Sequence, residues 1–387
     1  MFHVGTLPTL TFDAGGFVPA GDRGVWMATT ASRTVGLLVG VSVLALLLCG
    51  LLGGTARITG AVMLALFSAF AVLTALHAAR VATAAPRAAW RLLAVGLVGW
   101  TAAAVVELGR ALPTRGDDPR GWVGGLGYLW LPVCALLAAL VVEGYTRPAV
   151  RIRFVLDTIL IGSSLAAFAV SVFSHTPPDY VGLPWPLSVL AFVSYLVAAV
   201  LALILALEVD PGRRRAPGLV ALGLLLIGAS GMVHPYIGVF RQGGDRAQVA
   251  VELFWAAGLG ILGVAAMLIR SATGPPSFAP AIATRCSLLL PFLPVAIAVP
   301  LGTVYLWSSD SSHAVVLALG LVALTAALTR QLVLLEHKRR LFDAVIDAAQ
   351  HDHLTGLSNA SQFDDRFRHA MTLHVRDGAP VSVIAVR

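Results

Sequence analysis

Long apolar runs recur along this chain, and they constrain its fold more than any other feature of the sequence. A helix needs about 20 mostly apolar residues to cross the hydrocarbon core of a bilayer. The runs are residues 35–54, 58–79, 92–112, 122–142, 154–173, 185–207, 218–240, 249–269, 286–307 and 313–333. The connections between them are too short to hold a folded domain. We therefore expect an α-helical polytopic membrane protein with about ten transmembrane helices over residues 35–333.

The composition excludes several classes of protein. Hydrophobic residues make up 58% of the 387 residues and charged residues 12%, against about 45–50% and about 25% in soluble domains. This excludes an ordinary cytosolic enzyme, a disordered scaffold and a disulfide-stapled secreted domain. The three cysteines, Cys49, Cys134 and Cys286, lie inside apolar runs, so no disulfide framework is indicated. The net charge of +7 comes from single basic residues scattered between apolar runs, which indicates a lipid bilayer as partner and no nucleic acid.

The arginines of the connections favour one orientation in the membrane. Lysine and arginine gather in cytoplasmic loops. With a cytoplasmic N-terminus, thirteen arginines ahead of the C-terminal tail fall in inside segments and six in outside loops. We therefore predict a multi-pass protein of the cell membrane with both termini in the cytoplasm. Residues 1–34 form a polar tail with no cleavable signal peptide.

Ionisable residues inside apolar spans are costly and mark candidate functional positions. They are His77, Glu107, Arg110, Asp157, His234 and Glu252. Most lie near a predicted helix end, where the side chain reaches water, so a structural role is expected for them. His234 and Pro235 lie deep in a span, where a proline bends a helix and frees a carbonyl group. They form the candidate sensor pocket.

Ten spans also fit a secondary transporter built from two inverted five-helix repeats. Prolines interrupt the run over 286–307 as well as the run over 218–240, but nothing comparable interrupts the second and fourth spans. The sequence shows no internal repeat. A ten-helix transporter with a vestigial cytoplasmic tail is the alternative interpretation.

The character of the chain changes after the last apolar run. Residues 334–351 keep helical spacing and become amphipathic, with Leu335, Phe342, Ile346 and Ala349 on a heptad-like seam that Arg339 interrupts. We expect a connector helix that joins two chains as a homodimer. The alternative is a juxtamembrane helix whose basic residues contact lipid headgroups.

A specific resemblance begins directly after this connector. The segment HDHLTGLSNASQF resembles the opening signature of GGDEF domains, D-x-L-T-G-L-x-N-R-x-x-F. The family's arginine after the asparagine is Ala360 here. The matched residues are Asp352, Leu354, Thr355, Gly356, Leu357, Asn359 and Phe363. His351 and His353 are not expected to bind metal, because no further ligands lie nearby.

The resemblance implies the start of an α/β domain over residues 352–387. Ser358 or Asn359 caps a helix with one apolar stripe, Asp377-Gly378 forms a turn, and Val381–Val386 forms a buried strand. Complete members of the family are diguanylate cyclases, which bind GTP and Mg²⁺ and make cyclic di-GMP. Their first strand ends in a metal-binding aspartate, where this chain has Arg387, its last residue. The implied domain is therefore incomplete, either as a truncated product, which we favour, or as a naturally shortened sensor.

The expected function follows from both halves of the sequence. We expect the membrane sensor portion of a cyclic di-GMP signalling protein, with an incomplete GGDEF domain of the diguanylate cyclase family. This chain is expected to be catalytically inactive, with no catalytic residue, no metal ligand and no cofactor of its own.

Overall fold

Most of the apolar part of the chain is described by the structure. The computed structural model describes residues 36–38, 40–42, 44, 56–82, 84–111, 121–144, 148–173, 185–209, 214–239, 244–268, 286–306, 313–350, 359–378 and 380–384. The chain divides into two compact units, residues 1–323 and residues 324–387.

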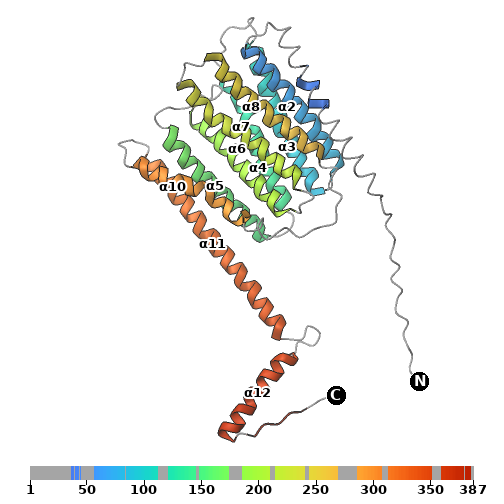
Figure 1. The fold of residues 1–387 in the computed structure, drawn as a ribbon, viewed down its shortest axis with the longest axis vertical. Coiled ribbons are helices and arrows are strands. Elements are labelled where there is room, and N and C mark those ends of the chain that lie inside the picture. The colour runs from blue at the N-terminus through green and yellow to red at the C-terminus, as the bar shows by residue number, and fades with distance from the viewer. Residues whose placement is uncertain are drawn as a thin grey trace, which may run out of the picture. The chain divides into compact units, whose positions relative to one another are not determined.

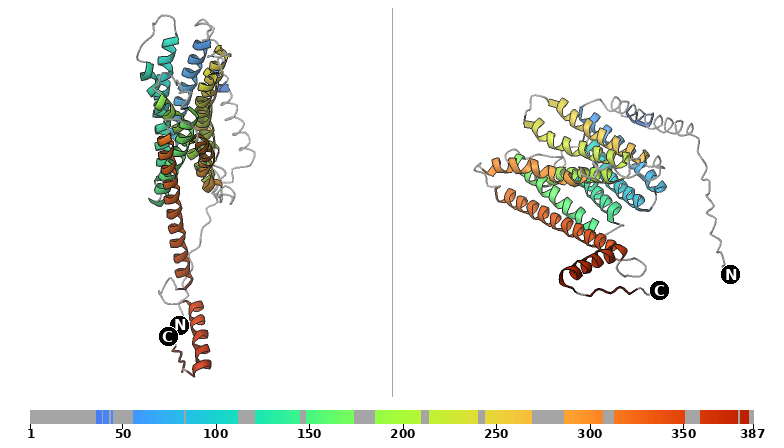
Figure 2. Two further views of the ribbon diagram at one scale, coloured as in Figure 1. Left: turned by 90° about the vertical axis from the view of Figure 1, so that its left-hand side faces the viewer. Right: turned by 60° about the horizontal axis from the view of Figure 1, so that its bottom comes forward.

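Six helices of the first unit lie side by side in one bundle (Figures 1 and 2), and their contacts form a closed ring. They are α2 (Ala56–Val81), α3 (Ala84–Ala111), α4 (Gly121–Gly144), α6 (Trp185–Glu208), α7 (Arg215–Val239) and α8 (Gly244–Met267). Helices α2, α3 and α4 contact each other in chain order, and so do α6, α7 and α8. Contacts between α4 and α6 and between α8 and α2 close the ring.

Glycines let these helices approach closely, as is common in membrane bundles. A Cβ atom added to Gly223 in α7 would lie 2.8 Å from the backbone oxygen of Gly258 in α8, and the reverse distance is also 2.8 Å. A Cβ atom added to Gly127 in α4 would lie 2.7 Å from the backbone oxygen of Gly99 in α3. The close approach of these helices therefore requires glycine, which has no side chain, at these positions.

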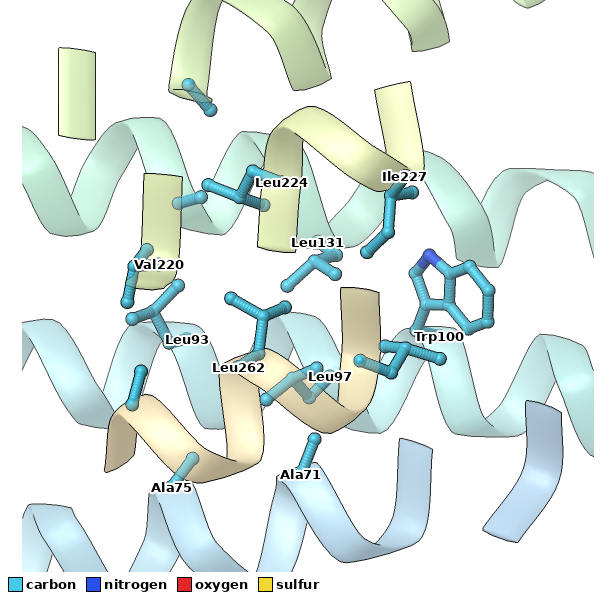
Figure 3. Close-up of a cluster of buried hydrophobic side chains, with 14 of the residues drawn as sticks. Ala71, Ala75, Leu93, Leu97, Trp100, Leu131, Val220, Leu224, Ile227 and Leu262 are labelled. Atoms are coloured by element: carbon cyan, nitrogen blue, oxygen red, sulfur yellow. The ribbon is translucent and has the colours of Figure 1, made fainter. Parts of the chain in front are cut away.

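The centre of the ring is filled by buried side chains (Figure 3). Leu93, Leu97, Leu131, Leu224 and Ile227 belong to one apolar cluster that draws on α3, α4 and α7. Beside them lies a cluster of four aromatic residues, Trp100, Tyr128, Tyr195 and Trp255, which we call the aromatic cluster. These four come from α3, α4, α6 and α8, so the cluster joins four members of the ring.

Helices α5 and α10 pack outside the ring. Helix α5 (Pro148–Phe173) packs against α6 and α10 (Leu293–Leu306), and a 3-10 turn, η3 (Leu290–Phe292), precedes α10. Val170 of α5, Tyr305 of α10 and Val316 form a small buried cluster. Val316 lies near the start of α11 (His313–Gln350), so this cluster links α5 and α10 to the beginning of α11.

Helix α11 is far longer than a membrane crossing requires. Its 38 residues correspond to about 57 Å at the α-helical rise, whereas the hydrocarbon core is about 30 Å thick. Along α11, Ala323, Ala326 and Arg330 are buried, and Arg330 is only 1% exposed. The helix thus continues without interruption from the last predicted span into the predicted connector.

Helix α12 (Ala360–Asp377) begins after Asn359, one of the two predicted N-caps, and ends at the predicted Asp377-Gly378 turn. The side-chain oxygen of Asn359 accepts a hydrogen bond from the backbone N–H of Gln362 at 2.9 Å. The helix ends at Gly378, whose φ of 67° favours glycine, and its N–H donates to the carbonyl of His374 at 2.9 Å. Arg376 donates to the Asp377 carboxylate at 2.7 Å, which lowers the pKa of that carboxyl group.

The structure corrects the prediction of a strand over residues 381–386. Residues 381–384 are described and form no strand, whereas 385–386 lie outside the described residues. A strand is stabilised by pairing with a neighbour, and no described segment of this chain forms a strand that could pair with it. The described part of the chain is therefore all-helical, and the expected α/β domain is wrong for it.

The predicted spans agree with the described helices in position. Seven described helices are long and apolar enough to cross a membrane, namely α2 to α6, the helix ending in α10, and α11. Helices α7 and α8 carry shorter described apolar stretches, Arg215–Gly231 and Val251–Met267. The predicted span over 35–54 lies mostly outside the described residues, so the total of about ten stays a prediction.

Filling a glycine contact tests this packing. Leucine at Gly223 would force α7 and α8 apart, so we expect Gly223→Leu to lower stability by at least about 1–3 kcal/mol. The matched control is Gly320→Leu, because a Cβ atom at Gly320 would meet nothing within 4 Å. Thermal unfolding in the same detergent measures both. Equal stability of the two variants would contradict the close α7–α8 approach.

Candidate functional site

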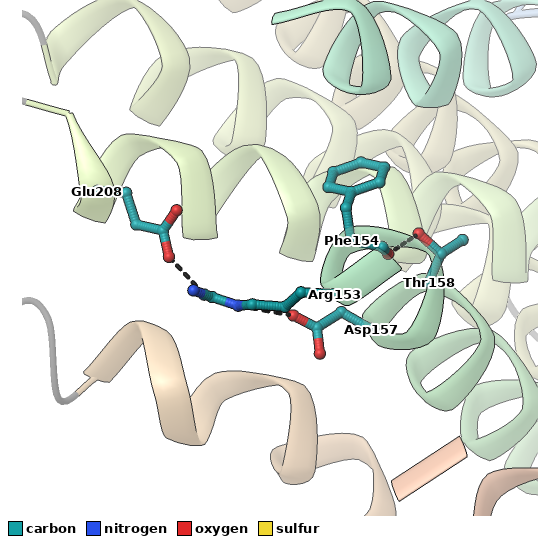
Figure 4. A network of polar contacts seen from close by, with 5 residues as sticks. All are labelled: Arg153, Phe154, Asp157, Thr158 and Glu208. Carbon is teal, nitrogen blue, oxygen red and sulfur yellow. Dashed lines mark hydrogen bonds and ion pairs between the residues drawn. The ribbon is translucent and has the colours of Figure 1, made fainter. Parts of the chain in front are cut away.

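A charged network joins α5 to the ring at one end of the bundle (Figure 4). Arg153 of α5 contacts the carboxylate of Asp157, one turn later, at 3.6 Å. The same guanidinium donates a hydrogen bond to Glu208, at the end of α6, at 2.5 Å. One cation therefore bridges two carboxylates on two helices, and we call these three residues the Arg153 network.

Burial makes the Arg153 network costly to break. The side chain of Asp157 is 3% exposed, whereas those of Arg153 and Glu208 are 25% and 29% exposed. A buried carboxylate that loses its cation is strongly destabilising, because the cost of taking the charge out of water is no longer offset by the ion pair. The network therefore fixes the ends of α5 and α6 relative to each other.

The helix ends near this network are also held by arginine. The Arg214 guanidinium donates to the carbonyl of Val209 at 2.9 Å and to that of Leu207 at 3.1 Å. These carbonyls belong to the last turn and the end of α6, where intrahelical partners run out. Arginine is suited to this position because its fork of N–H groups spans two acceptors.

The aromatic cluster is the second polar feature of the bundle. The indole N–H of Trp100 donates to the Tyr195 hydroxyl at 2.5 Å. That hydroxyl in turn donates to the backbone carbonyl of Tyr128 at 2.7 Å. The rings of Trp100 and Tyr128 meet edge to face with centroids 4.6 Å apart, and Trp255 lies 6.1 Å from Trp100. Three helices are therefore linked by hydrogen bonds inside an apolar core.

The structure describes the surroundings of most of the ionisable residues that were predicted inside spans. Asp157 belongs to the Arg153 network, and Glu107 pairs with Arg110 at 3.4 Å, three residues along α3. His77 is exposed on α2. The Glu252 carboxylate lies directly over Gly60 of α2, where an added Cβ atom would overlap it.

The candidate sensor pocket is only partly described. His234 and Pro235 lie in the last turns of α7, and their side chains lie outside the described residues. The pocket therefore stays a prediction.

Of the seven residues that match the GGDEF signature, the structure describes two. Asn359 caps α12, and Phe363 is 53% exposed on it and stacks on Phe367 with centroids 6.1 Å apart. The other five, Asp352, Leu354, Thr355, Gly356 and Leu357, lie outside the described residues. Among the residues that the structure describes, no three histidine, cysteine, aspartate or glutamate side chains gather as metal ligands.

Comparison with known proteins corrects the resemblance. No protein-family model, curated protein or solved structure matches this chain. Together with the all-helical structure of the described residues, this overturns the identification as a GGDEF domain. Of the matched residues that the structure describes, Asn359 caps α12 and Phe363 lies in its first turn, and such local chemistry serves many folds.

Sequence reasoning missed Arg153, Glu208 and the aromatic cluster. The spacing of Arg153 and Asp157 is that of a helical ion pair, so this half of the network could have been found. Glu208 lies 55 residues from Arg153 in the sequence, and no local pattern connects them. The same holds for Trp100 and Tyr195, which are 95 residues apart.

Breaking the Arg153 network tests its role in holding α5 to the ring. We expect Arg153→Leu to lower stability by about 3 kcal/mol, because Asp157 is left buried without its cation. The double variant Arg153→Leu/Asp157→Leu should regain most of that loss. Thermal unfolding in detergent measures both.

The matched control for this experiment is Arg151→Leu, since Arg151 is exposed on α5 two residues away. It should change the unfolding temperature little. A loss in the control as large as that of Arg153→Leu, or no recovery in the double variant, would contradict the role assigned to the network.

Proposed function

We propose that this chain is the membrane sensor portion of a signalling protein. The observation that carries the proposal is helix α11, which begins in contact with α5 and α10 and continues as one helix to Gln350. A rigid element of this length transmits a change in the bundle to residues beyond the membrane. The cyclic di-GMP output expected from the sequence rested on the corrected resemblance and is not part of the proposal.

Helix α5 provides the route from the ring to α11. On one side it contacts α6, through the Arg153 network and through an apolar cluster that includes Phe154, Ile161 and Val197. On the other side Val170 packs with Tyr305 and Val316. Packed helices have discrete alternative arrangements, so a shift of α6 would reach the first turns of α11 through α5.

One side of α11 presents an apolar seam, from Leu321 in the predicted span to Ile346 in the predicted connector, that is suited to a second copy of this chain. Heptad spacing places Leu321, Leu328, Leu332, Leu335, Phe342 and Ile346 on one side of the helix. These side chains are exposed, from 39% for Ile346 to 67% for Leu332. They lie away from the buried face that holds Ala323, Ala326 and Arg330. We infer a parallel homodimer along this seam.

Charge along the seam agrees with that partner. In a parallel coiled coil a residue at heptad position g faces position e of the following heptad in the other helix. Lys338 occupies position g and Asp343 the next position e, so each Lys338 would face Asp343 of the partner subunit. Arg339 lies on the seam itself, where a polar residue fixes the register at a cost in stability.

The bilayer is the other partner in this proposal. Seven long apolar helices support a membrane protein, and the arginine distribution supports a cell-membrane location with both termini in the cytoplasm. The alternative of a ten-helix transporter stays a prediction.

Disulfide trapping tests the homodimer in native membranes. Cysteine variants Leu335→Cys and Phe342→Cys, made after replacing Cys49, Cys134 and Cys286 by alanine, should form linked dimers on mild oxidation. The matched control, His337→Cys, lies on the same exposed helix away from the seam and should stay monomeric. Equal linkage at His337, or none at the seam, would contradict the proposal.

A charge exchange on the same background tests the register. Lys338→Glu should reduce the yield of linked dimer at Leu335→Cys, because it faces the Asp343 carboxylate of the partner subunit. Adding Asp343→Lys should restore the yield. Failure of the restoration would contradict the parallel register.

A further inference from the structure

The ring contains the same arrangement of three helices twice. Helices α2, α3 and α4 contact one another in the same order as α6, α7 and α8. If α2, α3 and α4 are matched to α6, α7 and α8, the contact of α4 with α6 corresponds to that of α8 with α2. Both closures of the ring are therefore equivalent in topology.

One constant shift of 127 residues relates all three pairs of helices. It maps the buried residues Leu93, Leu97 and Trp100 of α3 onto Val220, Leu224 and Ile227 of α7, which are also buried. In α2, it maps Ala71 and Ala75 onto Ala198 and Ala202. In α4, it maps Tyr128 and Ala135 onto Trp255 and Leu262. All of these residues are buried as well.

Specific contacts repeat at the same shift. Arg87 donates to the carbonyl of Ala82 at 3.1 Å between α2 and α3. Its equivalent, Arg214, donates to Val209, the equivalent of Ala82, at 2.9 Å between α6 and α7. Gly96 allows α3 to approach α4, and its equivalent, Gly223, allows α7 to approach α8.

The two groups of three helices, α2 to α4 and α6 to α8, run in the same direction. Gly60, Gly260 and Gly263 show that α2 and α8 are parallel, because residue 60 meets 252, residue 67 meets 260, and residue 70 meets 263. Helix α8 is antiparallel to α7, because residue 223 meets 262 whereas residue 227 meets 258. Helix α7 is antiparallel to α6, because residue 218 meets 206 whereas residue 228 meets 195. Helices α2 and α6 are therefore parallel, which differs from the inverted repeats of many transporters.

The two closures of the ring are held by different chemistry. At the α2–α8 closure, Phe67 and Phe70 lie on Gly260 and Gly263, and a Cβ atom on Gly263 would lie 2.3 Å from the Phe70 ring. None of the glycine contacts in the described part of the chain falls at the α4–α6 closure. There the Tyr195 hydroxyl donates across to the Tyr128 carbonyl.

The equivalents of these residues do not repeat that bridge. Ser68 is the equivalent of Tyr195, and its hydroxyl donates to Ala65 of its own helix at 3.0 Å. Ser194 and Val197 are the equivalents of Phe67 and Phe70. Each closure thus has a feature that the other lacks.

We propose that the ring is a conformational switch made of two parallel three-helix units, which opens at the α4–α6 closure when the Tyr195 bridge breaks. The interlocked α2–α8 closure acts as the hinge. Helix α5 contacts both α4 and α6, so separation of α4 from α6 would displace α5. That last step rests on the proposed function, whereas the opening itself does not.

Spin-label distances on the full chain in lipid nanodiscs test the proposal. One labelled pair, Leu126→Cys and Leu203→Cys, spans the α4–α6 closure. Its equivalent pair, Leu253→Cys and Leu76→Cys, spans the α8–α2 closure at the same shift of 127 residues, and all four side chains are at least 38% exposed. The unaltered ring should give similar distances for both pairs.

Breaking the bridge should affect one pair alone. In Tyr195→Phe the distance between labels 126 and 203 should lengthen by about 2 Å, the scale of helix shifts in such transitions. The distance between labels 76 and 253 should stay unchanged. The matched control, Tyr305→Phe, removes another buried tyrosine hydroxyl outside the ring and should move neither pair.

Three results would overturn the proposal. They are clearly unequal distances for the two pairs in the unaltered ring, equal shifts of both pairs in Tyr195→Phe, and no shift of either. If Tyr195→Phe does not fold, Trp100→Phe removes the indole donor to the same hydroxyl and should give a smaller shift of the first pair alone. An opening that leaves α11 unchanged would contradict the proposed function and leave this inference standing.

Discussion

Backbone N–H and C=O groups in an apolar span must find partners inside the protein, and the rest of the structure depends on this requirement. A helix satisfies them within one segment, so each long apolar run becomes a helix and the remaining problem is how the helices pack. With lipid as apolar as leucine, association depends on close contact and on a few hydrogen bonds. Gly223 against Gly258, and the Tyr195 hydroxyl between Trp100 and the Tyr128 carbonyl, supply both in this chain.

Charge is placed where its cost is smallest. The single cation of Arg153 pairs with the carboxylates of both Asp157 and Glu208, and Arg87 and Arg214 satisfy carbonyls at the ends of α2 and α6. These contacts hold helix ends together while the middle of the ring stays apolar and aromatic. The proposed opening separates α4 from α6, and α5 contacts both of these helices. The Arg153 network holds α5 to the end of α6.

The sequence predicts what is local and misses what is not. Apolar runs predict the positions of the helices, and Asn359 and Gly378 predict the ends of α12, because each signal lies within a few neighbouring residues. The strand over 381–386 was wrong because a strand needs a partner that local sequence does not reveal. The repeat is weak in the sequence because many equivalent positions hold different residues, such as Tyr128 and Trp255, or Ser68 and Tyr195. Identical pairs, such as Arg87 and Arg214, are scattered between them, and burial and contacts make the equivalence plain.

The central claim is that a change in the ring reaches the connector through α5, and one distance tests it directly. A single spin label at Arg340, exposed on α11 away from the seam, reports the separation of the two connectors in a homodimer. Glu208→Gln weakens the link between α6 and α5 without touching α11. The account predicts that this substitution changes the distance distribution at residue 340, whereas Arg151→Gln does not. An identical distribution in Glu208→Gln and the unaltered protein would contradict it.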